Sequence, residues 1–358
     1  MKFIHMADMH FDAPFTVLNI KNNLGEKRRL EQREVFKKVI NYIKENNIEY
    51  LFISGDLYEN EYVKESTIIY INNLFKEIPN TKIYISPGNH DPYIINSMYK
   101  NFNWNNNVKI FENKLECIEN ENIDIYGFGF NDFYCKGINL DNINIKNKEK
   151  INIFITHGTI DGGNTENLEY NPLNKNKLKE INFDYVALGH IHKLNYNEEP
   201  NQKIVYPGST ISMGFDEQGK HGVILGDISK DSLKLEFLPM DTKEFVEKEI
   251  DITDINSTEE LIEKLNEMNL LENNYYKINL IGKRNFEINC YYLYKFILKE
   301  NIIKIKDKTE INYNIEKISE ENNLKGLFLK EILEDERNNI LEKNIAEKII
   351  EIGLEILK

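Results

Sequence analysis

Five of the seven histidines in this chain lie in four short motifs that also carry aspartate and asparagine. A lone Asp-x-His or Gly-Asp would say little, but four motifs together supply carboxylate, imidazole and amide groups in a number suited to two neighbouring divalent cations. The motifs are Asp8-Met9-His10, Gly55-Asp56, Gly88-Asn89-His90-Asp91, and the pair His157-Gly158 with Gly189-His190-Ile191-His192.

Each motif directly follows a short apolar segment that reads as a buried strand. Helical patterns separate the first of these segments, at Glu26 to Glu45 and at Tyr62 to Glu77, which indicates βαβ units. The carboxyl ends of parallel strands meet at one edge of an open α/β sheet, so we expect the motifs to converge there. The five expected strands are Lys2 to His5, Tyr50 to Ser54, Lys82 to Ser86, Ile151 to Thr156 and Tyr185 to Leu188.

Closely spaced strand patterns between Val108 and Phe130, and more up to Leu238, predict two sheets packed face to face and flanked by helices. The fold class is therefore α/β, a four-layer α/β/β/α sandwich over residues 1–240. Residues 241–313 read as a small α+β capping domain, and residues 314–358 as a helical tail. The tail carries an apolar stripe at helical spacing, which can be core or partner surface: Leu341, Ile345, Ile349, Ile352 and Ile356.

The formal net charge of -14 argues against a protein that only coats nucleic acid, because such proteins are usually basic. Three widely spaced cysteines without a CxxC pair fit a reducing compartment. No apolar run approaches the roughly 20 residues needed to span a bilayer. The first residues are too polar for a signal peptide. We therefore expect a soluble, cytoplasmic protein that does not bind a membrane.

The chemistry of a two-metal site assigns different roles to these residues. Two close cations need a bridging carboxylate, and Asp56 is the best candidate because it follows the central strand of the first unit. Mixed imidazole and carboxylate ligands suit Mn, Fe or Zn better than Mg or Ca. His90 adjoins Asn89 but is expected to face a substrate, where an imidazole can stabilise charge or protonate a leaving oxygen.

In this order, D-x-H, G-D, G-N-H-D, H and G-H-x-H resemble the calcineurin-like metallophosphoesterase superfamily. Within it the chain is similar to the SbcD-type nuclease subunit, the bacterial relative of the double-strand-break repair nuclease. The similarity covers residues 1 to about 240 and rests on three further segments: Phe3 to His10, Ser54-Gly55-Asp56-Leu57-Tyr58, and Tyr206-Pro207-Gly208-Ser209. The resemblance implies two metal sites and a catalytic histidine, His90. One metal would be held by Asp8, His10, Asp56 and His192, and the other by Asp56, Asn89, His157 and His190.

The same resemblance implies an activity and a partner. The implied enzyme is an Mn²⁺-dependent phosphodiesterase, an exonuclease or endonuclease for DNA that works in DNA repair. Its partner would be an SbcC-type coiled-coil ATPase, held by the C-terminal helices. A homodimer remains open. Some family nucleases carry a histidine three residues after the bridging aspartate, where this chain has Glu59. The alternatives are a phosphatase or phosphodiesterase for a small nucleotide, and a non-catalytic metal-binding scaffold.

Several other residues receive simpler interpretations. Asp91 is expected to orient its loop or His90, His5 to pack within the first strand, and His221 to lie in a turn. A basic cluster in the first helix reads as a solvated helix face, with contacts to phosphates of a nucleic acid as the alternative. The cluster comprises Lys27, Arg28, Arg29 and Arg33.

Overall fold

The computed structural model describes residues 1–18, 23–161, 169–199, 201–311 and 315–357. These residues divide into two compact units, which we describe separately. Unit 1 consists of Met1–Val246 with Leu271–Tyr275, and unit 2 consists of Glu247–Leu270 with Tyr276–Lys358. No helix among the described residues is both long enough and apolar enough to cross a membrane.

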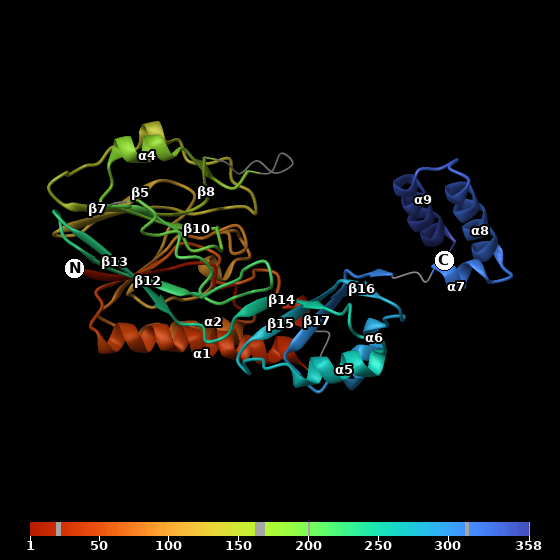
Figure 1. Ribbon diagram of the computed structural model, residues 1–358. Helices are drawn as coiled ribbons and strands as arrows, with labels where there is room; N and C mark the ends of the chain where they lie inside the picture. The colour runs from red at the N-terminus through yellow and green to blue at the C-terminus, as the bar shows by residue number, and fades with distance from the viewer. Residues whose placement is uncertain (19–22, 162–168, 200, 312–314, 358) are drawn as a thin grey trace. The chain divides into compact units, whose positions relative to one another are not determined.

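The first sheet of unit 1 has six strands in the order β13-β12-β1-β2-β3-β4 (Figure 1). Strands β1 to β4 are parallel, while β12 runs antiparallel to both β1 and β13. The parallel strands place their carboxyl ends at one edge, as the sequence predicts. Their bounds are β1 (Lys2–Met6), β2 (Tyr50–Ile53), β3 (Lys82–Ile85), β4 (Val108–Ile110), β12 (Gly222–Ile228) and β13 (Leu233–Pro239).

The second sheet has five strands in the order β11-β10-β7-β6-β5. Only β5 is antiparallel to its neighbour, so β6, β7, β10 and β11 also share one carboxyl edge. The bounds are β5 (Glu116–Glu119), β6 (Ile123–Phe128), β7 (Ile151–His157), β10 (Tyr185–Gly189) and β11 (Ile204–Val205).

Side-chain alternation along the strands builds three hydrophobic clusters, one between each pair of layers. In β1, Phe3 packs between the two sheets, whereas Ile4 and Met6 pack on the opposite face against the helices. The outer face of the second sheet contributes Phe154, which packs with Leu178 of α4. The α/β/β/α sandwich predicted from the sequence is thus confirmed. The covering helices are α1 (Leu24–Glu45) and α2 (Glu65–Lys76) on one side and α4 (Lys175–Ile181) on the other.

Short elements complete unit 1 and connect its layers. The helical turn η1 precedes α1, and the pair β8 and β9 follows the strand that ends in His157. Their bounds are η1 (Thr16–Leu18), α3 (Met98–Asn101), η2 (Leu140–Asn142), β8 (Thr159–Ile160) and β9 (Pro172–Leu173).

Unit 2 contains a three-stranded sheet in the order β14-β15-β17, a two-stranded pair β16-β18, and five helices among its described residues. Strand β14, which begins in unit 1, was not predicted from the sequence. The sequence from Ile302 to Tyr313 is strand-like throughout, but β17 ends at Asp307, and residues 312 and 313 lie outside the described residues. The bounds are β14 (Phe245–Asp251), α5 (Thr258–Glu267), β15 (Tyr275–Ile281), β16 (Lys283–Arg284), α6 (Cys290–Phe296), β17 (Ile302–Asp307), β18 (Glu310–Ile311), α7 (Ile315–Ser319), α8 (Leu324–Arg337) and α9 (Lys343–Ile356).

The apolar stripe predicted for the tail is not the face that packs. Helix α9 buries Ala346, Ile350 and Leu354, and the last two pack with Leu329 of α8. The members of the predicted stripe are half-buried or exposed, and Leu341 precedes the helix. The relative exposures are 46% for Ile345, 58% for Ile352 and 78% for Ile356.

The basic cluster of α1 also differs from the predicted solvated face. Arg28 is fully buried, and its guanidinium pairs with Asp241 and donates to the Ser212 carbonyl at 2.9 Å. Arg33 pairs with Asp12 at 3.2 Å. Arg28 therefore cannot contact a phosphate from inside the protein, whereas Lys27 is exposed, as predicted for the cluster.

Candidate metal centre

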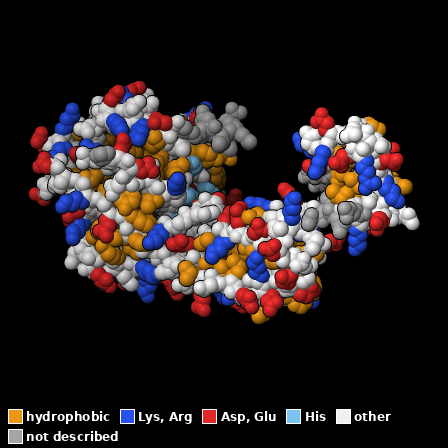
Figure 2. Space-filling model, in the orientation of Figure 1, with side chains coloured by type: hydrophobic (Ala, Val, Ile, Leu, Met, Phe, Trp, Pro, Cys, Tyr) orange, Lys and Arg blue, Asp and Glu red, His pale blue; other side chains and the backbone are white. Residues whose placement is uncertain are grey.

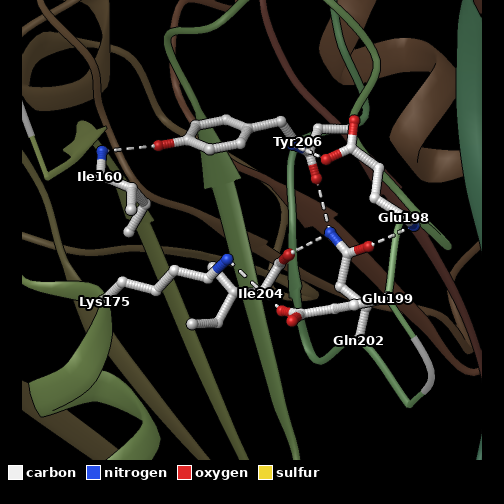
Figure 3. Close-up of a pocket in the computed structure, with 8 residues that line it drawn as sticks. Ile160, Lys175, Glu198, Glu199, Gln202, Ile204 and Tyr206 are labelled. Atoms are coloured by element: carbon white, nitrogen blue, oxygen red, sulfur yellow. Dashed lines mark hydrogen bonds and ion pairs between the residues drawn. The ribbon is translucent and has the colours of Figure 1, made fainter.

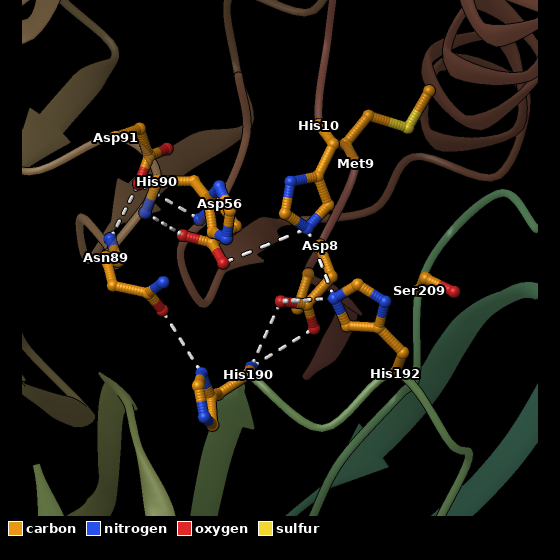
Figure 4. Close-up of polar contacts among 12 residues, drawn as sticks. Asp8, Met9, His10, Asp56, Asn89, His90, Asp91, His190, His192 and Ser209 are labelled. Atoms are coloured by element: carbon orange, nitrogen blue, oxygen red, sulfur yellow. Dashed lines mark hydrogen bonds and ion pairs between the residues drawn. The ribbon is translucent and has the colours of Figure 1, made fainter. Parts of the chain in front are cut away.

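Five loops at the carboxyl edges of the two sheets bring all seven predicted metal ligands into one region of unit 1. Figure 4 labels all of them except His157. Asp8 and His10 follow β1, Asp56 follows β2, and Asn89 follows β3. The second sheet contributes the other three ligands. His157 is the last residue of β7, and His190 and His192 follow β10.

One group of ligand atoms lies between β1 and β10. His10 Nε2 is 3.2 Å from His192 Nε2 and 3.8 Å from Asp56 Oδ2. His192 Nε2 is in turn 3.9 Å from Asp8 Oδ1. Asp8, His10 and His192 can offer ligand atoms that all lie within 4.8 Å of one another. This is the first of the two ligand sets that the resemblance implies.

The second group is tighter and shares Asp56 with the first. His157 Nε2 lies 3.3 Å from Asp56 Oδ2 and 3.0 Å from Asn89 Oδ1. His190 Nδ1 lies 3.1 Å from Asn89 Oδ1 and 3.3 Å from His157 Nε2. Ligands about 2.0–2.2 Å from one cation are about 2.8–3.6 Å from their neighbours, so these four residues fit an ion. Asp56 Oδ2 faces both His10 and His157, a position compatible with the bridging role predicted for it.

Each of three ligand histidines directs its second nitrogen to an oxygen outside the ligand set. His10 Nδ1 lies 2.7 Å from Glu59 Oε1, and His192 Nδ1 lies 2.5 Å from Glu217 Oε1. His157 Nδ1 is 2.8 Å from the Ser54 carbonyl. Such partners fix the tautomer and the ring orientation of a metal ligand. In all three rings this leaves Nε2 for the cation.

The ligand loops hold unusual backbone conformations. Asp8, His10, Asp56 and His190 have φ angles of 50°, 49°, 52° and 98°, in the left-handed region that few side chains favour. Gly55 has φ 88°, and a Cβ there would lie 2.4 Å from His157 Nδ1. Backbone strain of this kind gathers at functional sites, where the surrounding structure enforces it.

Asp91 is buried and holds the Asp56 loop, as its position in the motif suggests. Its Oδ1 accepts from Asp56 N at 3.0 Å, and its Oδ2 accepts from Leu57 N and the Tyr99 hydroxyl, both at 2.6 Å. Burial raises the pKa of Asp91 to about 6, and nearby Asp56 adds to the rise. Because all of these donors are protein groups, Asp91 stabilises the conformation of the loop that carries Asp56.

His90 lies beside the ligand groups but is more exposed than they are, with 45% of its side chain accessible. Its backbone N–H donates to Asp56 Oδ1 at 2.8 Å, and its Nδ1 lies 2.9 Å from Glu59 Oε2. Burial alone would lower the pKa of His90, but the hydrogen bond to Glu59 and the charge of Asp56 raise it to about 9. A protonated imidazole at the surface of the site is suited to donate to a substrate.

The ligand histidines differ in charge because their neighbours differ. Burial opposes the charge on His157, but Asp56 outweighs it and raises the pKa of His157 to about 9. Burial also lowers the pKa of His192, but the hydrogen bond to Glu217 outweighs burial and raises that pKa to about 9. Burial and the nearby His157 instead lower the pKa of His190 to about 3. The raised pKa values favour protonated His157 and His192 in the metal-free protein, and binding of a cation would displace these protons.

Two supporting groups were missed by sequence reasoning. Glu217 lies outside every motif, and only proximity in the fold reveals it. His5 is buried as expected, but it also joins the two sheets: its Nδ1 is 2.8 Å from the Tyr185 hydroxyl and its Nε2 is 3.1 Å from Ser54 Oγ. Ser54 is the residue whose carbonyl supports His157, and its position before the Gly-Asp motif was the available signal.

A separate pocket of about 250 Å³ lies next to the edge strand β11 (Figure 3). Its polar groups pair with one another: Lys175 with Glu199, and Gln202 with Asn195. None of the seven metal-site residues lines it. Histidine side chains are instead visible at the surface of unit 1 in Figure 2, in keeping with the exposure of His90 and His192. The metal centre is therefore the better candidate for the active site.

Comparison with known proteins agrees with this geometry. The sequence model described as "Calcineurin-like phosphoesterase" matches residues 1–194, more than half of the chain. YhaO of Bacillus subtilis (strain 168), named as an uncharacterized metallophosphoesterase, is 24% identical over 246 residues. The matched region is 66% of this chain and 60% of YhaO, so the chain spans only about three fifths of that relative's length.

Two solved structures are similar at low identity. TT1561 of Thermus thermophilus is 10% identical, with 66% of this chain and 98% of TT1561 covered and a TM-score of 0.41. A novel archaeal phosphodiesterase is 16% identical, with 66% of this chain and 100% of that chain covered and a TM-score of 0.35. At these TM-scores neither similarity bears on the activity.

Proposed function

Because this chain belongs to the calcineurin-like phosphoesterase family, we propose that it is a dinuclear-metal-dependent phosphodiesterase that cleaves DNA in repair. The observation that carries the proposal is the position of Asp56. Its Oδ2 faces both ligand groups, while its Oδ1 accepts from the backbone of His90. One carboxylate thus links the two cation positions to the proposed catalytic histidine.

The chain supplies binding and proton transfer in this reaction. Asp8, His10, Asp56 and His192 would hold one cation, and Asp56, Asn89, His157 and His190 the other. The two cations, when bound, offset phosphate charge and lower the pKa of the attacking water. We propose Mn²⁺, with Fe or Zn as alternatives, because imidazole and carboxylate ligands are mixed. His90 Nε2 is the ring nitrogen left for the substrate, since Nδ1 faces Glu59.

Aromatic side chains beside the centre support a nucleic-acid substrate. The ring of Tyr170 stacks on His190 with centroids 4.9 Å apart, and Tyr134 lies 5.8 Å from Tyr170. Tyr134 is half exposed. Exposed aromatic faces next to a phosphate site can stack on bases of single-stranded DNA.

We propose that the tail binds an SbcC-type coiled-coil ATPase, as the resemblance implies. The exposed residues Ile345, Ile352 and Ile356 are seven and four residues apart along α9, so they form one face of the helix. Apolar residues at such spacing are the anchors used when a helix docks on another helix. The opposite face packs on α8, which leaves the exposed face for a partner.

The proposal is tested with metal-depleted protein reloaded with Mn²⁺ and assayed on linear duplex DNA, single-stranded DNA, bis(p-nitrophenyl) phosphate and cyclic nucleotides. We expect cleavage of DNA that is lost in Asp56→Asn, with Asp124→Asn as a control for a buried aspartate that pairs with Lys150. Hydrolysis of the small diesters without DNA cleavage would support the small-nucleotide enzyme. Two bound metals without any hydrolysis would support the scaffold.

A further inference from the structure

Glu217 is a nearly buried carboxylate that faces the metal centre from outside the ligand set. Only 9% of its side chain is exposed, and its Oε1 lies 2.5 Å from His192 Nδ1. No motif and no part of the proposed reaction accounts for this side chain.

The second oxygen of Glu217 is held by the protein. Ser209 Oγ donates to Glu217 Oε2 at 2.7 Å, and Met213 N donates to the same oxygen at 3.2 Å. His221 Nε2 lies 2.9 Å from the Glu217 carbonyl. The carboxylate is therefore fixed before any cation binds, and its free oxygen is directed at His192.

This contact decides which nitrogen of His192 carries the proton. A carboxylate accepts a hydrogen bond only from a protonated Nδ1, which leaves the lone pair of a neutral ring on Nε2. Nε2 is the atom that faces His10 Nε2 at 3.2 Å and Asp8 Oδ1 at 3.9 Å. Glu217 therefore favours the tautomer in which His192 can bind a cation with Asp8 and His10.

The segment that carries Ser209 also ties the ligand loops together. Ser209 N donates to the His192 carbonyl at 3.0 Å, and Thr210 Oγ1 donates to the carbonyl of Ala7, next to Asp8, at 2.9 Å. The Tyr206 hydroxyl accepts a hydrogen bond from Ile160 N (Figure 3) and donates one to the carbonyl of Gly158, the residue after His157. Gly208 has φ 74°, and a Cβ there would lie 2.7 Å from the His192 carbonyl. The Tyr206-Pro207-Gly208-Ser209 segment, with Thr210, therefore holds together the loops that carry Asp8, His157 and His192.

We propose that Glu217 is a positioning residue of the metal centre, which holds His192 in its metal-binding tautomer and is itself held in place by Ser209. The inference rests on the proposed metal binding. Glu217 touches neither the substrate nor the cation. Removing a carboxylate that supports a ligand histidine typically weakens metal binding by about 10–100-fold.

The test measures metal binding by the full-length chain without any substrate. Wild type, Glu217→Gln and Ser209→Ala are depleted of metal and titrated with Co²⁺ and Mn²⁺ in competition with a chromogenic chelator. Glu116→Gln is the matched control, because Glu116 pairs with Lys109 at 2.9 Å and contacts no ligand histidine. Thermal unfolding in EDTA measures whether each variant still folds.

We expect Glu217→Gln to bind one of the two ions about 10–100-fold more weakly, with an altered Co²⁺ absorption spectrum and a cooperative unfolding transition retained in EDTA. Ser209→Ala should show a smaller loss in the same ion, and Glu116→Gln none. Wild-type affinity for both ions in Glu217→Gln and Ser209→Ala would overturn the proposal, as would equal losses in the control. If wild type binds two ions but cleaves no DNA, the proposed function fails while this inference stands.

Discussion

Glu59 Oε2 lies 2.9 Å from His90 Nδ1, and this contact leaves Nε2 as the ring nitrogen that does not face Glu59. The other oxygen of the same carboxylate is 2.7 Å from the ligand His10. Glu59 thus connects the metal centre to the group expected to transfer a proton. One carboxylate thus orients two histidines at once.

Glu59→Gln is expected to reduce kcat and to move the alkaline limb of its pH profile to lower pH. In the wild type, burial lowers the pKa of His90, but the hydrogen bond to Glu59 outweighs burial and raises that pKa to about 9. A neutral amide cannot stabilise the imidazolium as well, so His90 loses its proton at lower pH. The measurement is kcat against pH for both proteins, and superimposable profiles would show that Glu59 does not act through His90.

His90→Ala should keep both metals but lose about 10²–10⁴-fold in turnover, as is typical of one acid–base group. The reason is that its ring serves the transition state and not the bound cations. Elemental analysis beside the kinetic assay checks this. A metal content that falls in step with activity would make His90 a ligand or the support of one.

Asp56→Ala and Asn89→Ala should abolish hydrolysis through loss of metal. Asp56 faces both ligand groups, so its removal should lower the affinity for two ions, whereas Asn89 faces only the second group. The check is metal stoichiometry by elemental analysis after gel filtration. Two ions retained by Asp56→Ala protein would contradict the bridging assignment.

The metal-free protein is expected to lose stability as pH rises from about 6.5 to 9. The pKa values of His157 and His192 in the folded chain, about 9, lie above the usual value for histidine. The folded state therefore binds more protons than the unfolded state in this window, and its stability falls with rising pH. Unfolding temperatures measured in EDTA and with Mn²⁺ test this, because the cation should remove the decline by replacing the protons. A flat profile in EDTA would count against these shifts.

A chain that ends at Tyr313 should remain folded and hydrolyse a small phosphodiester, yet fail to co-purify with the ATPase. The tail helices α7 to α9 form their own hydrophobic cluster around Leu329, which supports their removal as a group. In the full chain, Ile352→Asp should weaken the same interaction, with Ile69→Asp on α2 as the exposed control. Unfolding of the truncated catalytic unit would show instead that the tail is part of its core.

The loops that carry the proposed metal ligands could be predicted because each motif is a short run of residues next to a strand pattern. Each motif directly follows an expected strand, and the carboxyl ends of parallel strands meet at one edge of the sheet. Contacts between distant segments were not predictable. Arg28 pairs with Asp241, which is 213 residues away in the sequence. Glu217 lies in no motif, so the sequence does not indicate its contact with His192. The sequence left open whether the α9 stripe is core or partner surface, because two faces of the helix have helical periodicity. The packing of Leu329 on Ile350 and Leu354 shows that the stripe is not the core face.

The left-handed backbone at Asp8, His10 and Asp56 has a consequence for laboratory evolution. Glycine adopts such a conformation at little cost, whereas other residues there can cost on the order of 1–3 kcal/mol each. A library of this protein selected for heat resistance in the absence of metal should therefore accumulate glycine at these three positions and lose the ability to bind metal. A selection that also requires catalysis should keep Asp8, His10 and Asp56 in spite of their strained backbone. The positions that stay unchanged in such a library would then identify the residues that the activity needs.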